Sequence, residues 1–406
     1  MVAQSAGMSR SPYVAVIGGG IIGCSAAAIL AERGATVTLF EATAIGAGAS
    51  GRNLGAIQHP FDPVLAPLYH ASLEAYRALA AHDEGFAMPA HAAGVLMINR
   101  DADASRRQVE RLTAAIPDLG AEFVDADAVA AAEPSLVPGF TACRLDTGYP
   151  IPPAAATAAF ARLAIQRGAQ IRIGARAEPW IEDGTVSGVI LADGTRHPAG
   201  SVLIAAGPWA PPLVDTSGAW EPIRRTWGVT VQLDLGDAAP HHVIEEDEVD
   251  AVNRPLVAAA RAAEGEPEAD PHTLFTIATA GGISTLGSTF LPSEPDGPRI
   301  ARLLIQRGAA YLPAIGGASV REIRVCARPQ SADSRPFIGP VTGIEGLFVC
   351  AGHGPWGIST GPASAELAVD AIISGAAVPP DLAATRPIER GPQAGSLPAG
   401  GVDDPR

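Results

Sequence analysis

Six consecutive residues near the N-terminus have the spacing of a phosphate-binding turn. Gly18, Gly20 and Gly23 form a G-x-G-x-x-G string that contains Ile21 and Ile22. In such a string the first glycine allows a tight turn, the second lets a pyrophosphate approach the backbone, and the third lets a helix pack closely on a strand. The N-terminus of the helix that follows then offers free N–H groups to phosphate oxygens.

The residues on either side of this string predict a βαβ unit. We expect a strand at Tyr13–Ile17, a helix at Ile21–Arg33 and a second strand at Thr36–Phe40. Glu41, with Ala42 beside it, ends the second strand, where a carboxylate accepts hydrogen bonds from ribose hydroxyls. A tight turn without a ligand is the alternative, but this context favours a dinucleotide site on a parallel sheet.

The charged residues exclude several kinds of chemistry. All 28 Lys+Arg positions are arginine, so a pyridoxal Schiff base, a Walker lysine and a lysine nucleophile are absent. The formal net charge is −15, and binding of a polyanion needs a basic face. We therefore expect no nucleic acid partner.

The cysteines and the apolar runs indicate the compartment. Cys24, Cys143, Cys326 and Cys350 are scattered without a CxxC spacing, which disfavours a disulfide framework or structural zinc and suits a reducing, cytoplasmic setting. The longest apolar run, residues 14–30, contains four glycines and is interpreted as a strand and a helix. We expect no transmembrane segment.

Three further stretches carry small and polar residues at the ends of expected elements. They are the loop Gly46–Gly55, the strand end Ala205–Trp209, and a C-terminal block in which Arg328-Pro329 precedes Asp333, Pro336–Gly339, Ala351–Gly354 and Gly357–Ser359. With the βαβ unit, these stretches resemble the D-amino acid oxidase superfamily of flavoenzymes, the group that contains glycine oxidase and sarcosine oxidase. The resemblance covers roughly Tyr13 to Ser374.

The resemblance implies FAD as the cofactor. NAD is the alternative, but an NAD-dependent dehydrogenase would not need the C-terminal block, which in the family closes over the flavin. The expected FAD contacts at the glycine turn and at the end of the second strand are Gly18, Gly20, Ile21, Ile22, Gly23, Glu41 and Ala42. The other expected FAD contacts are Ser50, Gly51, Arg52, Asn53, Leu54, Ala177, Ala206, Gly207, Trp209, Gly352, Gly354, Gly357, Ile358 and Ser359. For Asn53 a purely structural role in its loop is the alternative, and for Ser359 a helix N-cap.

Arg328 and His353 are the candidate catalytic residues. In the family, the arginine of the Arg-Pro pair clamps the substrate carboxylate, and the planar guanidinium fork suits both carboxylate oxygens. The alternative for Arg328 is an ion pair with Asp333 or a surface acid. His353, in a Gly-His-Gly turn, is placed to touch the flavin or the substrate, or simply completes the turn.

These residues predict FAD-dependent oxidation of the C–N bond of a small amino acid or secondary amine acid. Hydride transfer to flavin N5 would give an imine that hydrolyses, and oxygen or another acceptor would take the electrons. One alternative is a flavin-dependent 2-hydroxy acid dehydrogenase, which would want a base near the substrate. Another is a flavoprotein subunit of a hetero-oligomeric dehydrogenase; the sequence leaves homo- and hetero-oligomeric assembly open.

Several other residues have two interpretations. Cys326 stands near the position at which sarcosine oxidase-like relatives attach their flavin covalently, but non-covalent FAD is favoured because this chain lacks their lysines. Trp227 and Phe275 either line the pocket or pack in the core, and His59 is a weaker candidate for the site. His241 and His242, beside a predicted solvated acidic loop at 245–250, match no standard metal-ligand spacing, so we expect no metal.

The expected fold is α/β, with a Rossmann-like FAD-binding domain of the glutathione reductase type. An interleaved α+β substrate domain is expected to be built on a large mixed or antiparallel sheet. The predicted FAD-binding domain comprises 12–84, 146–212 and 326–378, and the substrate domain 85–145 and 213–325. Residues 1–11 and 379–406 are predicted to be disordered.

Overall fold

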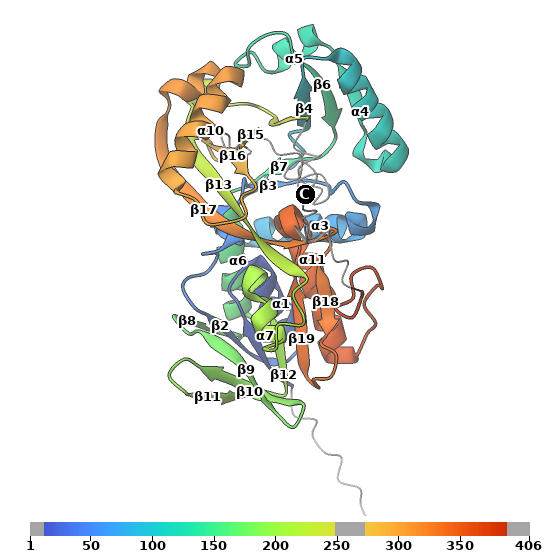
Figure 1. Cartoon of the computed structure of the whole chain (residues 1–406), viewed down its shortest axis with the longest axis vertical. Coiled ribbons are helices and arrows are strands. Elements are labelled where there is room, and N and C mark those ends of the chain that lie inside the picture. Colours follow the sequence, from blue (N-terminus) through green and yellow to red (C-terminus); the bar gives the residue numbers. More distant parts are fainter. Residues whose placement is uncertain (1–11, 248–272, 388–406) are drawn as a thin grey trace, which may run out of the picture.

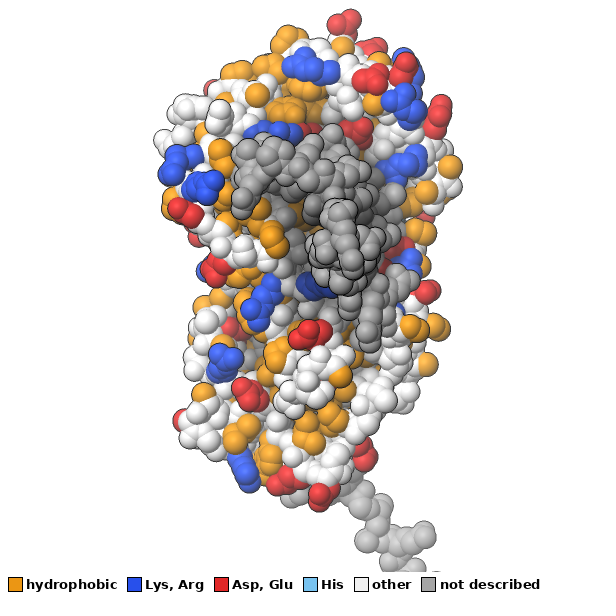
Figure 2. Space-filling view, in the orientation of Figure 1, with side chains coloured by type: hydrophobic (Ala, Val, Ile, Leu, Met, Phe, Trp, Pro, Cys, Tyr) orange, Lys and Arg blue, Asp and Glu red, His pale blue; other side chains and the backbone are white. Residues whose placement is uncertain are grey.

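The structure of the protein is a computed structural model that describes residues 12–247 and 273–387. Two sheets and the helices packed on them form the two halves seen in Figure 1. Charged side chains of both signs are interspersed over the face in Figure 2. Within the described residues, no helix is long and apolar enough to span a membrane.

The lower half is built on a six-stranded sheet. Its strand order is β18-β19-β12-β1-β2-β8, and all neighbours are parallel except β18 and β19. The strands are β1 (Tyr13–Ile17), β2 (Thr36–Glu41), β8 (Gln170–Ile173), β12 (Ser201–Ile204), β18 (Phe337–Pro340) and β19 (Leu347–Ala351). The central strands β1 and β12 are almost continuously apolar, and their side chains are largely buried. This is the pattern of a sheet that has helices on both faces.

Helices pack around this sheet and on each other. The main ones are α1 (Ile21–Glu32), α3 (Ala66–His82), α6 (Pro153–Gln166) and α11 (Gly357–Ser374), with the short helices α2 (Ala49–Arg52) and α7 (Pro211–Val214). Helix α1 contacts both α6 and α11. A Cβ on Gly361 of α11 would lie 3.0 Å from the Ile21 side chain, so α1 and α11 approach as closely as a glycine allows.

A three-stranded sheet lies beside the lower half (Figure 1). It consists of β9 (Ala177–Glu182), β10 (Thr185–Leu191) and β11 (Arg196–Pro198). Asp183 and Gly184 join β9 to β10 with φ angles of 49° and 76°, the positive values that a two-residue hairpin turn requires. Asp-Gly is a residue pair that favours such a turn, and the two strands pair antiparallel on either side of it.

The upper half is built on an eight-stranded sheet with the order β17-β13-β16-β15-β14-β4-β6-β5. Only β14 and β4 pair in parallel, so the sheet is mixed, as predicted. The strands are β4 (Val95–Asn99), β5 (Glu122–Val124), β6 (Thr141–Leu145), β13 (Ile223–Asp234), β14 (Val243–Glu246), β15 (Thr273–Ala280), β16 (Ile283–Thr289) and β17 (Ser319–Ser331). The sheet thus joins strands from both predicted substrate-domain segments, and the predicted boundary at 326 lies inside β17.

The remaining elements cover and connect the two halves. Helix α10 (Gly297–Tyr311) packs on strands β13, β15, β16 and β17. Helices α4 (Ala102–Ala115) and α5 (Ala126–Ala132) lie at the far end of the upper half (Figure 1). The small pairs and turns are β3 (Ala56–Ile57) with β7 (Tyr149–Pro150), and the 3-10 helices η1 (Pro63–Leu65), η2 (Pro117–Leu119), η3 (Gly207–Trp209), η4 (Gly236–Ala238), η5 (Pro313–Gly317) and η6 (Gly354–Trp356).

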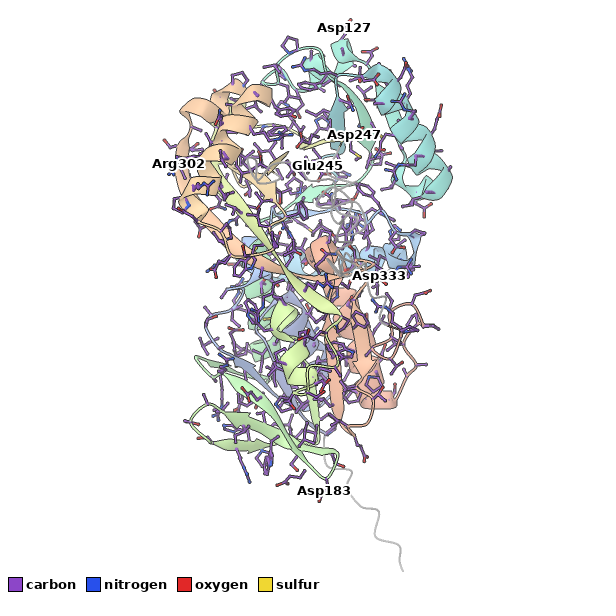
Figure 3. All side chains as sticks on the ribbon, viewed as in Figure 1. Asp127, Asp183, Glu245, Asp247, Arg302 and Asp333 are labelled. Carbon is purple, nitrogen blue, oxygen red and sulfur yellow. The ribbon has the colours of Figure 1, made fainter. Side chains whose placement is uncertain are left out.

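The prediction of a solvated acidic loop at 245–250 is wrong for its described part. Glu245, labelled in Figure 3, and Glu246 lie on β14 and are only 4% and 6% exposed. Glu246 accepts hydrogen bonds from the Phe275 N–H (2.7 Å) and the Tyr311 hydroxyl (2.6 Å), and pairs with Arg307 at 2.5 Å. These partners come from β15 and α10, so the local sequence could not reveal them. Residues 248–250 lie outside the described residues.

The prediction of disorder from residue 379 is wrong for residues 379–387. Leu382 is 2% exposed, its carbonyl accepts from the Ile338 N–H at 2.8 Å, and the Ala384 N–H donates back to Ile338 at 2.7 Å. Arg386 pairs with Asp333 at 3.1 Å and covers the Phe337 ring. The segment therefore packs along β18, which its Pro-rich and Gly-rich composition did not indicate. The prediction for 388–406 lies outside the described residues.

Leu382→Ala is expected to lower the free energy of unfolding by about 2–5 kcal/mol, because it removes a buried side chain from the core against β18. Thr385→Ala, at an exposed position of the same segment, serves as the matched control and should change stability little. Urea unfolding of both variants measures this. Equal stabilities for the two variants would contradict the packed arrangement.

Candidate active site

The glycine turn after β1 has the close approaches that the sequence predicts. Gly18 has φ +114°, and a Cβ there would lie 2.5 Å from the Ala205 carbonyl oxygen. A Cβ on Gly23 would lie 1.9 Å from the Gly18 carbonyl oxygen. The turn can therefore form only with glycine at these positions, and it holds the start of α1 close to Ala205, the residue after β12.

Glu41 and Ser50 are fixed beside this turn. Glu41 ends β2 and accepts hydrogen bonds from the Gly19 N–H at 2.7 Å and from the N–H and hydroxyl of Thr43 at 2.7 and 2.8 Å. Ser50 accepts from the Ile21 N–H at 2.9 Å. The exposed Ala42 follows Glu41. A carboxylate, a hydroxyl and a helix N-terminus thus meet at one end of the parallel sheet.

Ala177 and the residues after β12 frame the same end of the sheet. Ala177 is buried at the start of β9, just after Ala175, whose N–H bonds the Glu41 carbonyl at 2.9 Å. Ala206 follows β12, and Gly207 begins η3 with φ +55°. Trp209 is 45% exposed, and a Cβ on Gly48 would lie 3.7 Å from its ring.

The loop Gly46–Gly55 connects the two halves. Asn53 donates to the carbonyls of Ala49 and Ser50 at 3.0 Å and accepts from the Gly55 N–H at 2.8 Å, so its amide satisfies the loop backbone. Gly51 is buried, and the Leu54 side chain lies 3.8 Å from where a Cβ on Gly287 would be. The Asn53 side chain therefore stabilises the conformation of its own loop.

Arg52 extends from this loop to the edge of the upper sheet. Its guanidinium donates to the Val325 carbonyl of β17 at 2.9 Å, and its own carbonyl accepts from the Thr230 hydroxyl at 3.1 Å. Its side chain is largely exposed. Arg52 therefore docks the loop on β13 and β17.

Arg324 is a buried residue of this region that sequence reasoning missed. It is 4% exposed and donates to the carbonyls of Asn53 (3.1 Å) and Gly51 (3.4 Å), and to the hydroxyls of Thr230 (3.2 Å) and Thr285 (3.3 Å). No carboxylate of the described residues pairs with it within 4 Å, and burial lowers its pKa. The one available signal was its position four residues before Arg328, on the same face of a strand.

Arg328 lies on the same face of β17 and also has no carboxylate partner among the described residues. Its Nη1 donates to the Thr289 carbonyl at 2.7 Å and its Nη2 to the Ser288 hydroxyl at 2.6 Å. Burial lowers the pKa of the guanidinium, which still stays charged at neutral pH. Asp333, labelled in Figure 3, pairs instead with Arg386, so the predicted alternative of an Arg328–Asp333 ion pair is not found.

The C-terminal turn brings β19 to the start of α11. Gly352 and Gly354 have φ angles of +96° and +54°, and η6 leads into Gly357 at the helix start. The Ile358 carbonyl accepts from the Tyr76 hydroxyl at 2.8 Å. The Ser359 hydroxyl accepts from the Gln58 N–H at 3.0 Å, so Ser359 ties α11 to the segment after the loop Gly46–Gly55 rather than capping the helix.

His353 is fully buried in this turn. Neither ring nitrogen has a hydrogen-bond partner among the described residues. Burial lowers its pKa to about 3, with the charge of Arg386 as a further cause. His59, another candidate, is 2% exposed, contacts the Pro60 carbonyl at 2.7 Å, and also has a pKa lowered by burial. Both histidines are neutral at neutral pH.

Phe275 and Trp227 lie on the face of the upper sheet away from Arg324 and Arg328. Phe275 is 1% exposed and stacks on Tyr311 of α10, with ring centroids 4.4 Å apart. Trp227 alternates with Gly228 along β13, so its side chain lies on the opposite face from Gly228. Core packing therefore accounts for Phe275.

Cys326 lies between the two arginines on β17. It is 7% exposed, and burial raises the pKa of its thiol, although Arg328, Arg324 and Arg52 act in the opposite direction. The four cysteines are free and buried.

His242 pairs with the buried Glu133 at 2.7 Å. Within the described residues, no cluster of three or more His, Cys, Asp or Glu could hold a metal ion.

Comparison with known proteins places the chain in a family. The model of the family described as FAD dependent oxidoreductase matches residues 13–371. The chain belongs to this family.

Relatives of this FAD-dependent oxidoreductase cover nearly all of it. Glycine oxidase of Pseudomonas putida is 28% identical over 379 residues, 90% of this chain and 95% of that protein. The solved glycine oxidase structure from Bacillus cereus has a TM-score of 0.76 at 25% identity and covers 90% of this chain and 96% of that one. The tRNA 5-methylaminomethyl-2-thiouridine biosynthesis bifunctional protein MnmC of Chromohalobacter salexigens is 27% identical over 401 residues, 87% of this chain and 53% of that protein.

The residues of the oxidoreductase fit an FAD molecule. The turn at Gly18–Gly23 leaves no room for a Cβ at Gly18 or Gly23, so a pyrophosphate could approach the backbone at the start of α1, where Ser50 holds the Ile21 N–H. The Glu41 carboxylate ends the neighbouring strand, as ribose recognition requires. The C-terminal turn meets both halves, because η6 contacts β17 of the upper sheet and leads into α11 of the lower half.

Gly23→Ala is expected to raise the dissociation constant for FAD at least about tenfold, because the added Cβ collides with the Gly18 carbonyl and displaces the start of α1. FAD retained per chain after purification and fluorescence titration of the apoprotein measure this. Gly200→Ala, where the nearest heavy atom is 3.9 Å from the new Cβ, is the control. Unchanged FAD affinity in Gly23→Ala would contradict the assignment of the turn.

The buried His353 is expected to make the free energy of unfolding of the protein depend on pH. Its pKa is about 3 in the folded chain against an ordinary value of 6.5, so the unfolded chain binds more protons between these values. The free energy of unfolding should therefore fall as the pH decreases through 6.5, by up to about 1.4 kcal/mol per pH unit from this residue. Urea unfolding of wild type and His353→Phe from pH 7.5 to 5 measures it, and His59 keeps its own contribution in both. An identical slope in the two proteins would rule out the contribution of His353.

Proposed function

We propose that this oxidoreductase oxidises the C–N bond of a small amino acid or secondary amine acid whose carboxylate binds Arg328. The observation that carries the proposal is the state of Arg328: a half-buried guanidinium with two neutral oxygen partners and no carboxylate among the described residues. Even partial burial of a charge without a counter-ion is unfavourable, and an anionic substrate would compensate it. The names of the glycine oxidase relatives support the same substrate class.

In the proposed reaction, the protein acts mainly by orienting the substrate. When bound, FAD would supply the acceptor for the hydride. Arg328 would hold the carboxylate bidentately and thereby orient the α-carbon, and a neutral substrate amine would need no further acid or base. The imine product would leave and hydrolyse in water.

The hydroxy acid alternative has less support. Removing the hydroxyl proton of a 2-hydroxy acid calls for a general base within reach of the substrate. His59 and His353 are both buried, and His59 Nε2 and both ring nitrogens of His353 are shielded from solvent. We therefore favour an amine over an alcohol.

We further propose that FAD binds without a covalent link and contacts the residues predicted from the sequence, with Arg52 and Asn53 acting through the loop backbone. The buried Cys326 has a raised pKa, and attack on a flavin needs the thiolate. We also propose the predicted division into two discontinuous domains and a cytoplasmic location. The net charge of −15 favours a small-molecule substrate over RNA.

A flavoprotein subunit remains the second candidate. It is favoured by the MnmC relative, because the sequence similar to this chain covers only 53% of that larger, bifunctional protein. Co-purification of a second chain from the native source distinguishes a subunit from a self-sufficient enzyme.

Anaerobic mixing with glycine, N-methylglycine, the alanine and proline enantiomers, glycolate and lactate tests the proposed function. We expect the visible flavin band to bleach with at least one amine and with neither hydroxy acid. Arg328→Gln should raise the half-saturating concentration roughly 10- to 100-fold, since a charge-assisted hydrogen bond contributes about 1.5–3 kcal/mol. Arg321→Gln, an exposed residue of the same strand paired with Asp234, should behave as wild type. Bleaching only by hydroxy acids, or equal behaviour of both variants, would contradict the proposal.

A further inference from the structure

The guanidinium of Arg328 lies in a flat slot between Gly228 and Phe290. On one side, a Cβ built on Gly228 would lie 2.6 Å from Nη1 and 2.7 Å from Cζ and Nη2. On the other side, Cζ lies 4.5 Å from the centroid of the Phe290 ring. Gly228 therefore leaves free the space beside the guanidinium, and a Cβ at this position would force the guanidinium to shift.

Two hydrogen bonds fix the rotation of the guanidinium within this slot. Nη1 donates to the Thr289 carbonyl and Nη2 to the Ser288 hydroxyl, at 2.7 and 2.6 Å. A guanidinium has five N–H groups in one plane, so three remain for a ligand. A ligand carboxylate can meet them bidentately only when it lies in that plane.

The sheet register places both walls of the slot. Thr226 pairs with Arg328 and Gly228 with Cys326, so Gly228 is the diagonal neighbour of Arg328 on the same face of β13 and β17. Phe290 follows β16, and the next residue, Leu291, exchanges two backbone hydrogen bonds with Trp227 at 2.7 and 2.9 Å. Backbone pairing of Gly228 with β17 and of Leu291 with Trp227 therefore holds the two walls in place.

We propose that Gly228 and Phe290 are positioning residues that determine the specificity for a planar carboxylate by holding Arg328 flat. The absence of a Cβ at Gly228 admits the guanidinium, and the Phe290 ring covers its other face through a cation–π contact. The two residues thereby fix the plane in which the substrate carboxylate binds. This inference rests on the proposed role of Arg328 in the proposed function.

Binding of simple carboxylates to the FAD-loaded protein tests the slot without turnover. Calorimetric titration with acetate and benzoate should show at least tenfold weaker binding for Gly228→Ala than for wild type, with FAD content and melting temperature close to wild type. Gly317→Ala, where a new Cβ meets nothing within 4 Å, should bind like wild type. Unchanged carboxylate affinity in Gly228→Ala would overturn the inference.

A double-mutant cycle separates positioning from a general structural effect. Lysine has no planar fork, so the penalty of Gly228→Ala should shrink to less than about threefold in an Arg328→Lys background. A penalty of the same size in both backgrounds would show that Gly228 acts independently of Arg328 and would overturn the inference.

Phe290 provides a second variant should Gly228→Ala fold poorly. Phe290→Leu should weaken carboxylate binding several-fold, and Phe290→Tyr should restore it, because only an aromatic face attracts the guanidinium. Equal affinities for Leu and Tyr variants would overturn the inference.

The outcomes also separate the slot from the proposed function. If these variants lose carboxylate binding but no amine bleaches wild-type flavin, the slot stands and the proposed function fails. If an amine bleaches wild type and Gly228→Ala with the same half-saturating concentration, the proposed function stands and the slot fails.

Discussion

The buried guanidinium of Arg324 is the interaction on which the site depends. It joins the loop Gly46–Gly55 of the lower half to strands β13, β16 and β17 of the upper half through two carbonyls and two hydroxyls. Burying a charge without a counter-ion is costly unless its hydrogen bonds are satisfied. These four acceptors meet that condition only when the loop and the sheet are in contact. The relative placement of the glycine turn and Arg328 therefore depends on Arg324.

The side chains of strand β17 alternate between the hydrophobic core and the candidate active site. Arg324, Cys326 and Arg328 lie on the face toward the loop, whereas Val325 lies on the face covered by α10 and packs against Gly297 there. Moving the strand by one residue would exchange these faces and bury the arginines under α10. The long pairing of β17 with β13 thus fixes which side chains face a substrate.

The local sequence predicted those elements for which the hydrophobic pattern and the turn residues indicate the same structure. The βαβ unit around Gly18–Gly23 follows from the glycine positions, and the resemblance supplied the fold and Arg328. The missed features depend on partners far away in the chain. Arg324 meets Gly51 and Asn53, Glu246 meets Arg307, and Leu382 packs beside Ile338. No local sequence pattern distinguishes these buried charged or tail residues from exposed ones. The role of Gly228 can be inferred only when the register between β13 and β17 is known.

The most direct test of the central claim, that Arg328 orients the substrate, is a crystal structure of the FAD-loaded protein with a non-reacting carboxylate such as acetate bound. The account predicts that both carboxylate oxygens lie within about 3 Å of Arg328 nitrogens, in the plane of the guanidinium, with the methyl carbon directed toward the flavin ring. A carboxylate bound elsewhere, or an Arg328 turned toward a protein carboxylate, would contradict it.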